Sequence, residues 1–107
     1  MIYLVSEKGQ RTIKIGYTER AAQRQTDYAT CSTVAQFIDW ANGSKADEKN
    51  WQMTLEFFSF EKVFPEREKS EWYYMPDWID KRKLMSKGFD YLVEVLNKHY
   101  VELVENL

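Results

Sequence analysis

The first thirty residues carry side chains whose types and spacing suit phosphate chemistry. Arg24 and Tyr28 are four residues apart, so on a helix they share one face. Tyr3 and Lys14 stand ahead of them in two short apolar runs. Arg matches the planar geometry of a phosphate and Lys supplies a point charge. A Tyr beside such cations can relay the proton of an attacking water, so this set suits cleavage of a phosphodiester bond.

A carboxylate is needed as well, because phosphodiester cleavage of this kind uses a divalent cation such as Mg²⁺ that keeps several of its waters. Glu48, in the first turn of an expected helix, is the candidate. A Glu at that position also suits the helix dipole, which is a purely structural role. Asp39, Asp47 and Glu56 are rival carboxylates.

The elements that must position these side chains begin with a hairpin. Two β-branched and aromatic runs flank a turn containing Gly, which predicts paired strands over 1–16. Gly16 ends the second strand, and its missing Cβ lets another group approach closely there. Thr18 is the expected N-cap of a helix over 19–29. Because that helix has little apolar surface, we expect one of its faces to be exposed.

Patterns in the rest of the chain predict a strand over 33–41, a helix over 45–62 and an aromatic segment over 71–75. Two further helices are predicted over 77–86 and 89–105. The segment 71–75 is either a fourth strand or extended chain packed on the core. Ser44 and Asp47 form a near capping box at the start of the second helix.

Two apolar stripes predict buried helix faces. The first lies on the second helix and comprises Trp51, Leu55 and Phe58, widened by Phe57 and Phe60. The second lies on the last helix, and we expect that helix to dock along this face. It comprises Phe89, Leu92, Leu96, Tyr100, Leu103 and Leu107.

Composition narrows the class of protein. A chain of 107 residues is long enough for one domain. It contains no run of about 18 apolar residues, so we expect no membrane-spanning helix. The first residues lack the pattern of a signal peptide, and Cys31 is the only cysteine, so we expect a cytoplasmic protein without disulfides or a cysteine zinc site. The net charge of −2 argues against general affinity for nucleic acid, although residues 1–30 carry five basic and three acidic side chains.

The order of these motifs resembles the opening of the GIY-YIG endonuclease superfamily. Ile2-Tyr3 is followed about ten residues later by Lys14-Ile15-Gly16, and Arg24 and Tyr28 come eight and twelve residues after that Gly. The closest resemblance is to the compact, phage-associated branch whose second motif reads Lys-Ile-Gly. Residues 43–48 resemble the family's helix with the metal-binding Glu, and Glu71-Trp72-Tyr73 resembles its closing Glu-Trp-Phe signature.

The resemblance implies an α+β fold. A small three-stranded antiparallel sheet flanked by helices would occupy 1–75, and a C-terminal helical extension over 76–107 would pack on the same domain. The implied activity is divalent-metal-dependent hydrolysis of DNA phosphodiester bonds.

The resemblance also implies a role for each site residue. Glu48 would be the ligand of one Mg²⁺ or Mn²⁺, and Lys14 and Arg24 would lie beside the scissile phosphate. Tyr3 and Tyr28 would lie by the nucleophilic water, with Tyr28 better placed to act as the base.

Two departures from the family pattern bear on activity. Met1 replaces the Gly of the first motif, and Gln52 stands where many relatives have a His. They leave open an alternative, in which the chain is a catalytically degenerate DNA- or protein-binding module, such as a phage accessory factor in the host cytoplasm. A third reading is a structural oligomer assembled through the last helix. DNA is the expected partner, with a homo-oligomer or protein partner through the C-terminal helices as a further candidate, and no membrane.

Overall fold

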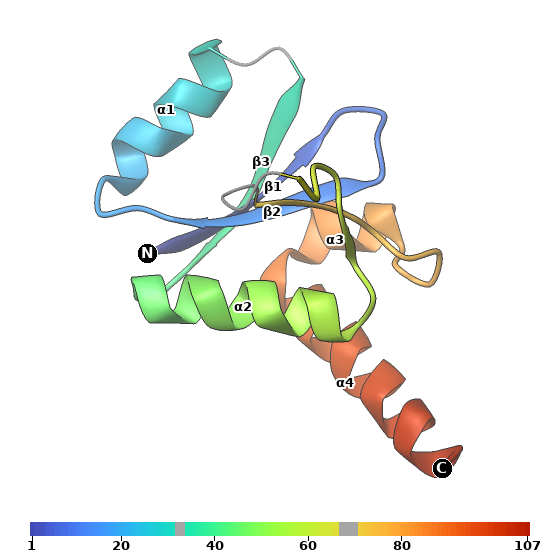
Figure 1. The fold of residues 1–107 in the computed structure, drawn as a ribbon. Coiled ribbons are helices and arrows are strands. Elements are labelled where there is room, and N and C mark those ends of the chain that lie inside the picture. The colour runs from blue at the N-terminus through green and yellow to red at the C-terminus, as the bar shows by residue number, and fades with distance from the viewer. Residues whose placement is uncertain (32–33, 67–70) are drawn as a thin grey trace.

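The computed structural model describes residues 1–31, 34–66 and 71–107, with the side chains of residues 28–31 outside the description. It shows the predicted α+β class (Figure 1): helices and a five-stranded antiparallel sheet of order β3-β1-β2-β5-β4. The elements are β1 Ile2–Glu7, β2 Thr12–Tyr17, α1 Ala21–Cys31, β3 Ala35–Ala41, α2 Lys45–Phe57, β4 Glu61–Lys62, β5 Trp72–Tyr74, α3 Lys81–Lys87 and α4 Phe89–Glu105.

The N-terminal hairpin forms as predicted. β1 and β2 pair with Tyr3 opposite Gly16 and Val5 opposite Lys14. The turn between them contains Gly9, whose φ of 71° is the left-handed conformation that favours glycine. Because side chains alternate along a strand, Tyr3, Lys14 and Gly16 belong to the same face of the sheet.

The sheet has five strands, so the expected three-stranded sheet is wrong in its extent. The aromatic segment after Glu71 is a true strand, β5, whose residues 72–74 pair with residues 12–14 of β2. The short strand β4 then adds to the outer edge of β5. Backbone groups on the edge of β2 need partners, and the returning chain supplies them.

The second helix ends earlier than predicted. The expected span was 45–62, but α2 ends at Phe57 because Ser59 adopts a left-handed φ of 66°. The N–H groups of Ser59 and Phe60 then bond the carbonyls of Glu56 and Leu55 at 3.1 and 3.0 Å, which closes the helix. Its start is as predicted, with Ser44 as N-cap.

Two other helices start later than predicted. The helix expected over 19–29 begins at Ala21, and the Thr18 hydroxyl accepts a hydrogen bond from the Arg20 N–H in the turn before it. The helix expected over 77–86 begins at Lys81, with Asp80 as its N-cap. Residues 76–79 form a turn in which the Ile79 N–H bonds the Pro76 carbonyl.

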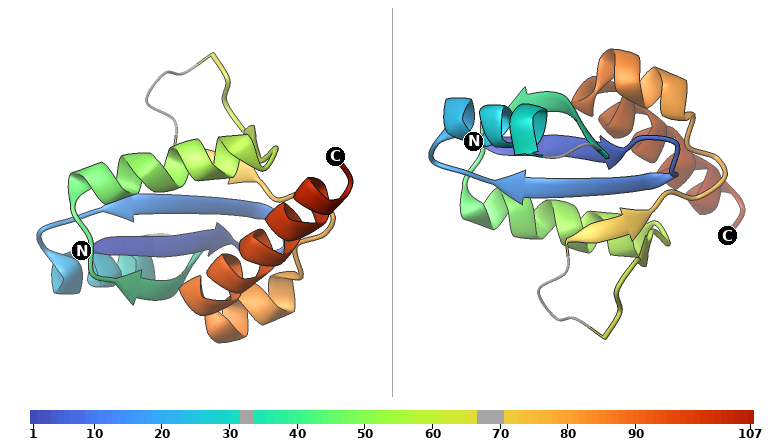
Figure 2. Two further views of the ribbon diagram at one scale, coloured as in Figure 1. Left: turned by 90° about the horizontal axis from the view of Figure 1, so that it is seen from below. Right: turned by 90° about the horizontal axis from the view of Figure 1, so that it is seen from above.

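The main core lies between the sheet and the helices α2 and α4, which cover one side of it, while α1 lies on the other side (Figure 2). Leu55 and Phe58 are buried there with Trp51 packed against them, as the helical spacing predicts. Phe57, expected to widen that stripe, is instead 65% exposed. None of the described helices is long and apolar enough to span a membrane.

The last helix has the predicted bounds but docks over only part of its length. Phe89, Leu92 and Leu96 are buried, whereas Tyr100, Leu103 and Leu107 are exposed. The expected stripe therefore packs only in its first half. The reason is geometric: α4 runs past the body of the molecule, and its last turns project from it (Figure 1).

Candidate functional site

The ring of Tyr3 forms the centre of the candidate site. It is only 2% exposed and lies directly across Gly16 on the neighbouring strand. A Cβ at Gly16 would come within 2.3 Å of both Cζ and Oη of Tyr3. The prediction that Gly16 permits a close approach is therefore confirmed, and the approaching group is a predicted site residue.

Two predicted cations flank this ring. Lys14 Nζ, from β2, lies 5.9 Å from the centroid of Tyr3, and Arg24 Cζ, from α1, lies 6.0 Å from it. These are cation–π distances, which contribute about 0.5–2 kcal/mol each depending on their exposure. The first strand pair and the first helix thus bring two positive groups to one phenol.

Trp40 packs against the Tyr3 ring from the neighbouring strand β3. It lies opposite Tyr3 on β3, and the two rings meet edge to face with centroids 5.9 Å apart. Phe37 supports Trp40 in turn at 4.6 Å. Edge-to-face pairs favour one relative orientation, so these contacts restrict how the Tyr3 ring can turn.

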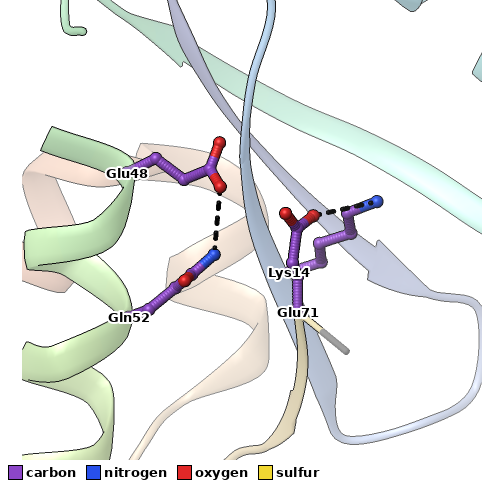
Figure 3. A network of polar contacts seen from close by, with 4 residues as sticks. All are labelled: Lys14, Glu48, Gln52 and Glu71. Carbon is purple, nitrogen blue, oxygen red and sulfur yellow. Dashed lines mark hydrogen bonds and ion pairs between the residues drawn. The ribbon is translucent and has the colours of Figure 1, made fainter. Parts of the chain in front are cut away.

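The carboxylate of Glu48 approaches the site from α2. Ser44 and Asp47 form a reciprocal capping box that fixes the start of this helix, and Glu48 lies in its first turn. Gln52, one helical turn on, donates from Nε2 to Glu48 Oε1 at 3.3 Å (Figure 3). The Gln at the position noted as a departure from the family pattern therefore orients the predicted metal ligand.

Glu71 connects Glu48 to Lys14, and it was absent from the predicted site. Its Oε2 lies 3.4 Å from Lys14 Nζ, and its carboxyl faces that of Glu48 (Figure 3). Partial burial raises the pKa of Glu48, and the charge of Glu71 and a hydrogen bond with it raise that pKa further. The sequence signal was the Glu71-Trp72-Tyr73 motif, which indicated the end of the domain rather than a role in the site.

The structure thus brings together Tyr3, Lys14 and Arg24 by direct proximity, and Glu48 joins them by way of Glu71. Tyr28 is part of α1, one turn beyond Arg24, but its side chain lies outside the described part of the structure. Its predicted role as a base stays a prediction.

The donor set at Glu48 and Glu71 fits a magnesium-type ion. Mg²⁺ commonly binds through one or two carboxylates and keeps several waters, and a cation between two facing carboxylates relieves their repulsion. Within the described residues, no group of three or more His, Cys, Asp or Glu side chains is arranged to hold a metal.

Comparison with known proteins gives no match: no family model matches the sequence, and neither a curated protein nor a solved structure is significantly similar to it.

Proposed function

We propose that this chain is a divalent-metal-dependent endonuclease that hydrolyses DNA phosphodiester bonds, acting in the cytoplasm. The observation that carries the proposal is the convergence of Lys14 and Arg24 on the Tyr3 ring, with Glu48 adjoining through Glu71. Two cations beside a phenol, next to a pair of carboxylates, supply the groups that phosphodiester hydrolysis requires. The ordered sequence motifs of the GIY-YIG type support the same reaction.

Each side chain has a distinct part in this proposal. Arg24 and Lys14 bind the non-bridging oxygens of the scissile phosphate and stabilise the negative charge that grows on them as water attacks. The Tyr3 hydroxyl, fixed across Gly16, orients the attacking water by a hydrogen bond. Water forms its bond to phosphorus as the bond to one ester oxygen breaks. Tyr28 would take the proton that this water loses, and the departing ester oxygen takes up a proton from solvent.

Glu48 would hold the metal, oriented by the hydrogen bond from Gln52, and Glu71 would keep Lys14 in place through their ion pair. A bound Mg²⁺ or Mn²⁺ supplies Lewis-acid stabilisation of the phosphate oxygens.

The test is nicking of supercoiled plasmid in Mg²⁺ or Mn²⁺ by the wild type, Glu48→Gln and Arg24→Ala. Loss of either group should lower the rate about 10²–10⁴-fold, because each acts on the transition-state charge. Glu56→Gln, on the same helix as Glu48, and Arg20→Ala, just before α1, are the matched controls and should cut at the wild-type rate.

Two results would count against the proposal. Equal nicking by all variants would show that a contaminant cuts the plasmid. Absence of nicking by the wild type, combined with retention of DNA on a filter or gel, would favour the alternative of a degenerate DNA-binding module with the same fold.

A further inference from the structure

The outer side of α3 is entirely cationic or hydroxylic. This helix contains four basic residues and no acidic one. Its Leu84 is fully buried against the body of the molecule, which fixes the side that faces inward. The exposed side chains of the helix are Arg82, Lys83, Ser86 and Lys87.

The β1–β2 turn extends this basic region beyond the helix. Lys81 Nζ donates to the carbonyl of Glu7 at 2.8 Å and to that of Gln10. Arg11, at the end of the turn, donates in return to two carbonyls of the segment before α3. Both cations are thus held by uncharged groups, and the exposed Lys8 lies in the same turn. We call the whole set the α3 basic surface: Lys8, Arg11, Lys81, Arg82, Lys83 and Lys87.

The charges of the α3 basic surface repel one another. Burial and the charge of Arg11 lower the pKa of Lys81, and the attraction of Glu7 offsets this only in part. Lys83 and Lys87 are four residues apart on the helix, a spacing that is destabilising for like charges. Within the described ranges, no member of the surface forms an ion pair with a carboxylate.

The net charge of this region is opposite in sign to that of the whole chain. Residues 7–11 and 77–87 together carry six basic and three acidic side chains, a net charge of +3, whereas the whole chain carries −2. Two of the three carboxylates are occupied locally, because Glu7 accepts a hydroxyl of β2 and Asp80 caps the start of α3. Cations gathered against their own repulsion indicate a surface that meets a negatively charged partner.

The surface also has room for a phosphate group. A hollow of about 450 Å³ is lined by Lys81, Arg82, Met85 and Ser86. The Arg guanidinium matches the geometry of a phosphate, and Lys and Ser side chains are common donors to the DNA backbone.

We propose that the α3 basic surface binds the phosphate backbone of duplex DNA at a distance from the bond that is cut. The identity of this polyanion rests on the proposed endonuclease function. Figure 2 shows α1 near the N-terminal end of β1 and α3 near the β1–β2 turn, so the hairpin runs between them. Arg11 and Gly16 are five residues apart along the chain of β2, which is about 17 Å at 3.3 Å per residue.

This spacing suits a duplex that lies along the hairpin. A length of about 17 Å corresponds to roughly five base steps of B-DNA. The same duplex can therefore contact Lys14 and Arg24 near one end of the hairpin and the α3 basic surface at the other.

The experiment measures the binding of a fluorescein-labelled duplex to the full chain by fluorescence anisotropy, in EDTA so that no cleavage takes place. The double variant Arg82→Gln, Lys83→Gln should raise the Kd about 10-fold at roughly 0.1 M salt, because two phosphate contacts are lost. The slope of log Kd against log salt concentration should fall by about 1.8, which is about 0.9 for each contact. The circular dichroism spectrum should not change, since both side chains are exposed.

Two matched variants separate this surface from the general effect of charge. Lys62→Gln, Lys98→Gln removes the same charge from β4 and α4 and should bind as the wild type does. Arg82→Lys, Lys83→Arg keeps both charges and should bind within about threefold of the wild type, because contacts to the DNA backbone depend mainly on charge.

Three results would overturn the inference. The wild type could fail to bind the duplex, the Lys62 and Lys98 control could weaken binding as much as the Arg82 and Lys83 variant, or polyglutamate could displace the duplex as well as unlabelled DNA does. Loss of the endonuclease proposal would look different. A chain that binds DNA as expected but nicks no plasmid would contradict that proposal alone, whereas nicking by a chain whose Arg82 and Lys83 variant binds normally would contradict this inference alone.

Discussion

Gly16 determines where the Tyr3 ring can lie. We expect Gly16→Ala to displace this ring, because the added Cβ would come within 2.3 Å of its hydroxyl end and the ring, only 2% exposed, has little room to move. Overpacking of this kind costs about 1–3 kcal/mol of unfolding free energy. Urea denaturation followed by Trp fluorescence would measure it.

Gly43→Ala is the matched control for that substitution. Its added Cβ would meet Ile2 and Asp47 at 3.2 and 3.3 Å, contacts that small shifts can relieve. We therefore expect a smaller loss than at Gly16. An equal or greater loss at Gly43 would contradict this expectation, because the Tyr3 ring would then move aside at least as easily as Ile2 and Asp47.

Glu48 gives the fold a pH dependence of known sign. Because burial and Glu71 raise its pKa in the folded state above the ordinary 4.5, the folded chain holds this proton more tightly than the unfolded chain. Its contribution to stability is therefore full at acidic pH and is lost as the pH rises through the raised folded value. In metal-free buffer, wild-type stability relative to Glu48→Gln should fall between pH 4 and neutrality, as urea titrations at several pH values would measure.

Glu56→Gln serves as the control in the same titrations, since Glu56 lies on the exposed side of α2 and pairs with Lys62 at 3.5 Å. Its difference from the wild type should not fall as the pH rises. If Glu48→Gln also leaves the pH profile unchanged, the two facing carboxylates are not coupled in solution.

At the scale of single elements, the N-terminus of α4 is capped by a side chain from the strand β3. Gly88, at its N-terminus, has no side chain to offer, and the Asp39 carboxylate of β3 accepts the Phe89 N–H at 2.9 Å instead. Gly88 also has a φ of 59°, and a Cβ there would come within 2.3 Å of the same carboxylate. A residue fifty positions away thus satisfies the helix end, and Gly88 makes room for it.

We expect Asp39→Ala to cost about 1–2 kcal/mol, because the Phe89 N–H loses its partner at a partly buried helix end. Thermal unfolding followed by circular dichroism would show a lower Tm. Asp77→Ala, an exposed Asp in the turn before α3, should change stability by less than about 0.5 kcal/mol. Equal stability of the two variants would mean that water replaces Asp39 without loss.

At the scale of the whole molecule, one core joins the N-terminal and C-terminal parts of the sequence. Ile13 and Ile15 of β2 belong to the same cluster of buried residues as Leu84, Leu92 and Leu96 of the last two helices. The structure also links the β1–β2 turn to the segment before α3, where Arg11 donates to the carbonyls of Pro76 and Ile79 at 2.7 and 2.8 Å.

We therefore expect a single cooperative unfolding transition. Leu92→Ala should lower the free energy of unfolding by about 2–5 kcal/mol, because Leu92 is fully buried and its truncation leaves a cavity. Denaturation followed in parallel by Trp fluorescence and far-ultraviolet circular dichroism would test this. Glu94→Ala, two residues on and exposed, should unfold like the wild type. Separate transitions for sheet and helix signals would instead indicate that residues 76–107 unfold on their own.

Local patterns in the sequence were enough to place the hairpin, the Ser44 capping box and the bounds of α4. Hairpins, caps and helical stripes depend on neighbours close in the chain, so side-chain types and spacing can predict them. The same patterns put Tyr3, Lys14 and Arg24 in one candidate site. The sequence predicted that these three side chains share one site, but it did not predict the distances between them.

The tertiary structure alone decided what depends on contacts between distant segments. The order of the five strands and the place of Glu71 between Lys14 and Glu48 both arise from such contacts. The apolar stripe of α4 shows the difference most clearly. Its period is continuous in the sequence, yet only its first half is buried, because burial depends on where the body of the molecule ends rather than on the pattern of the helix.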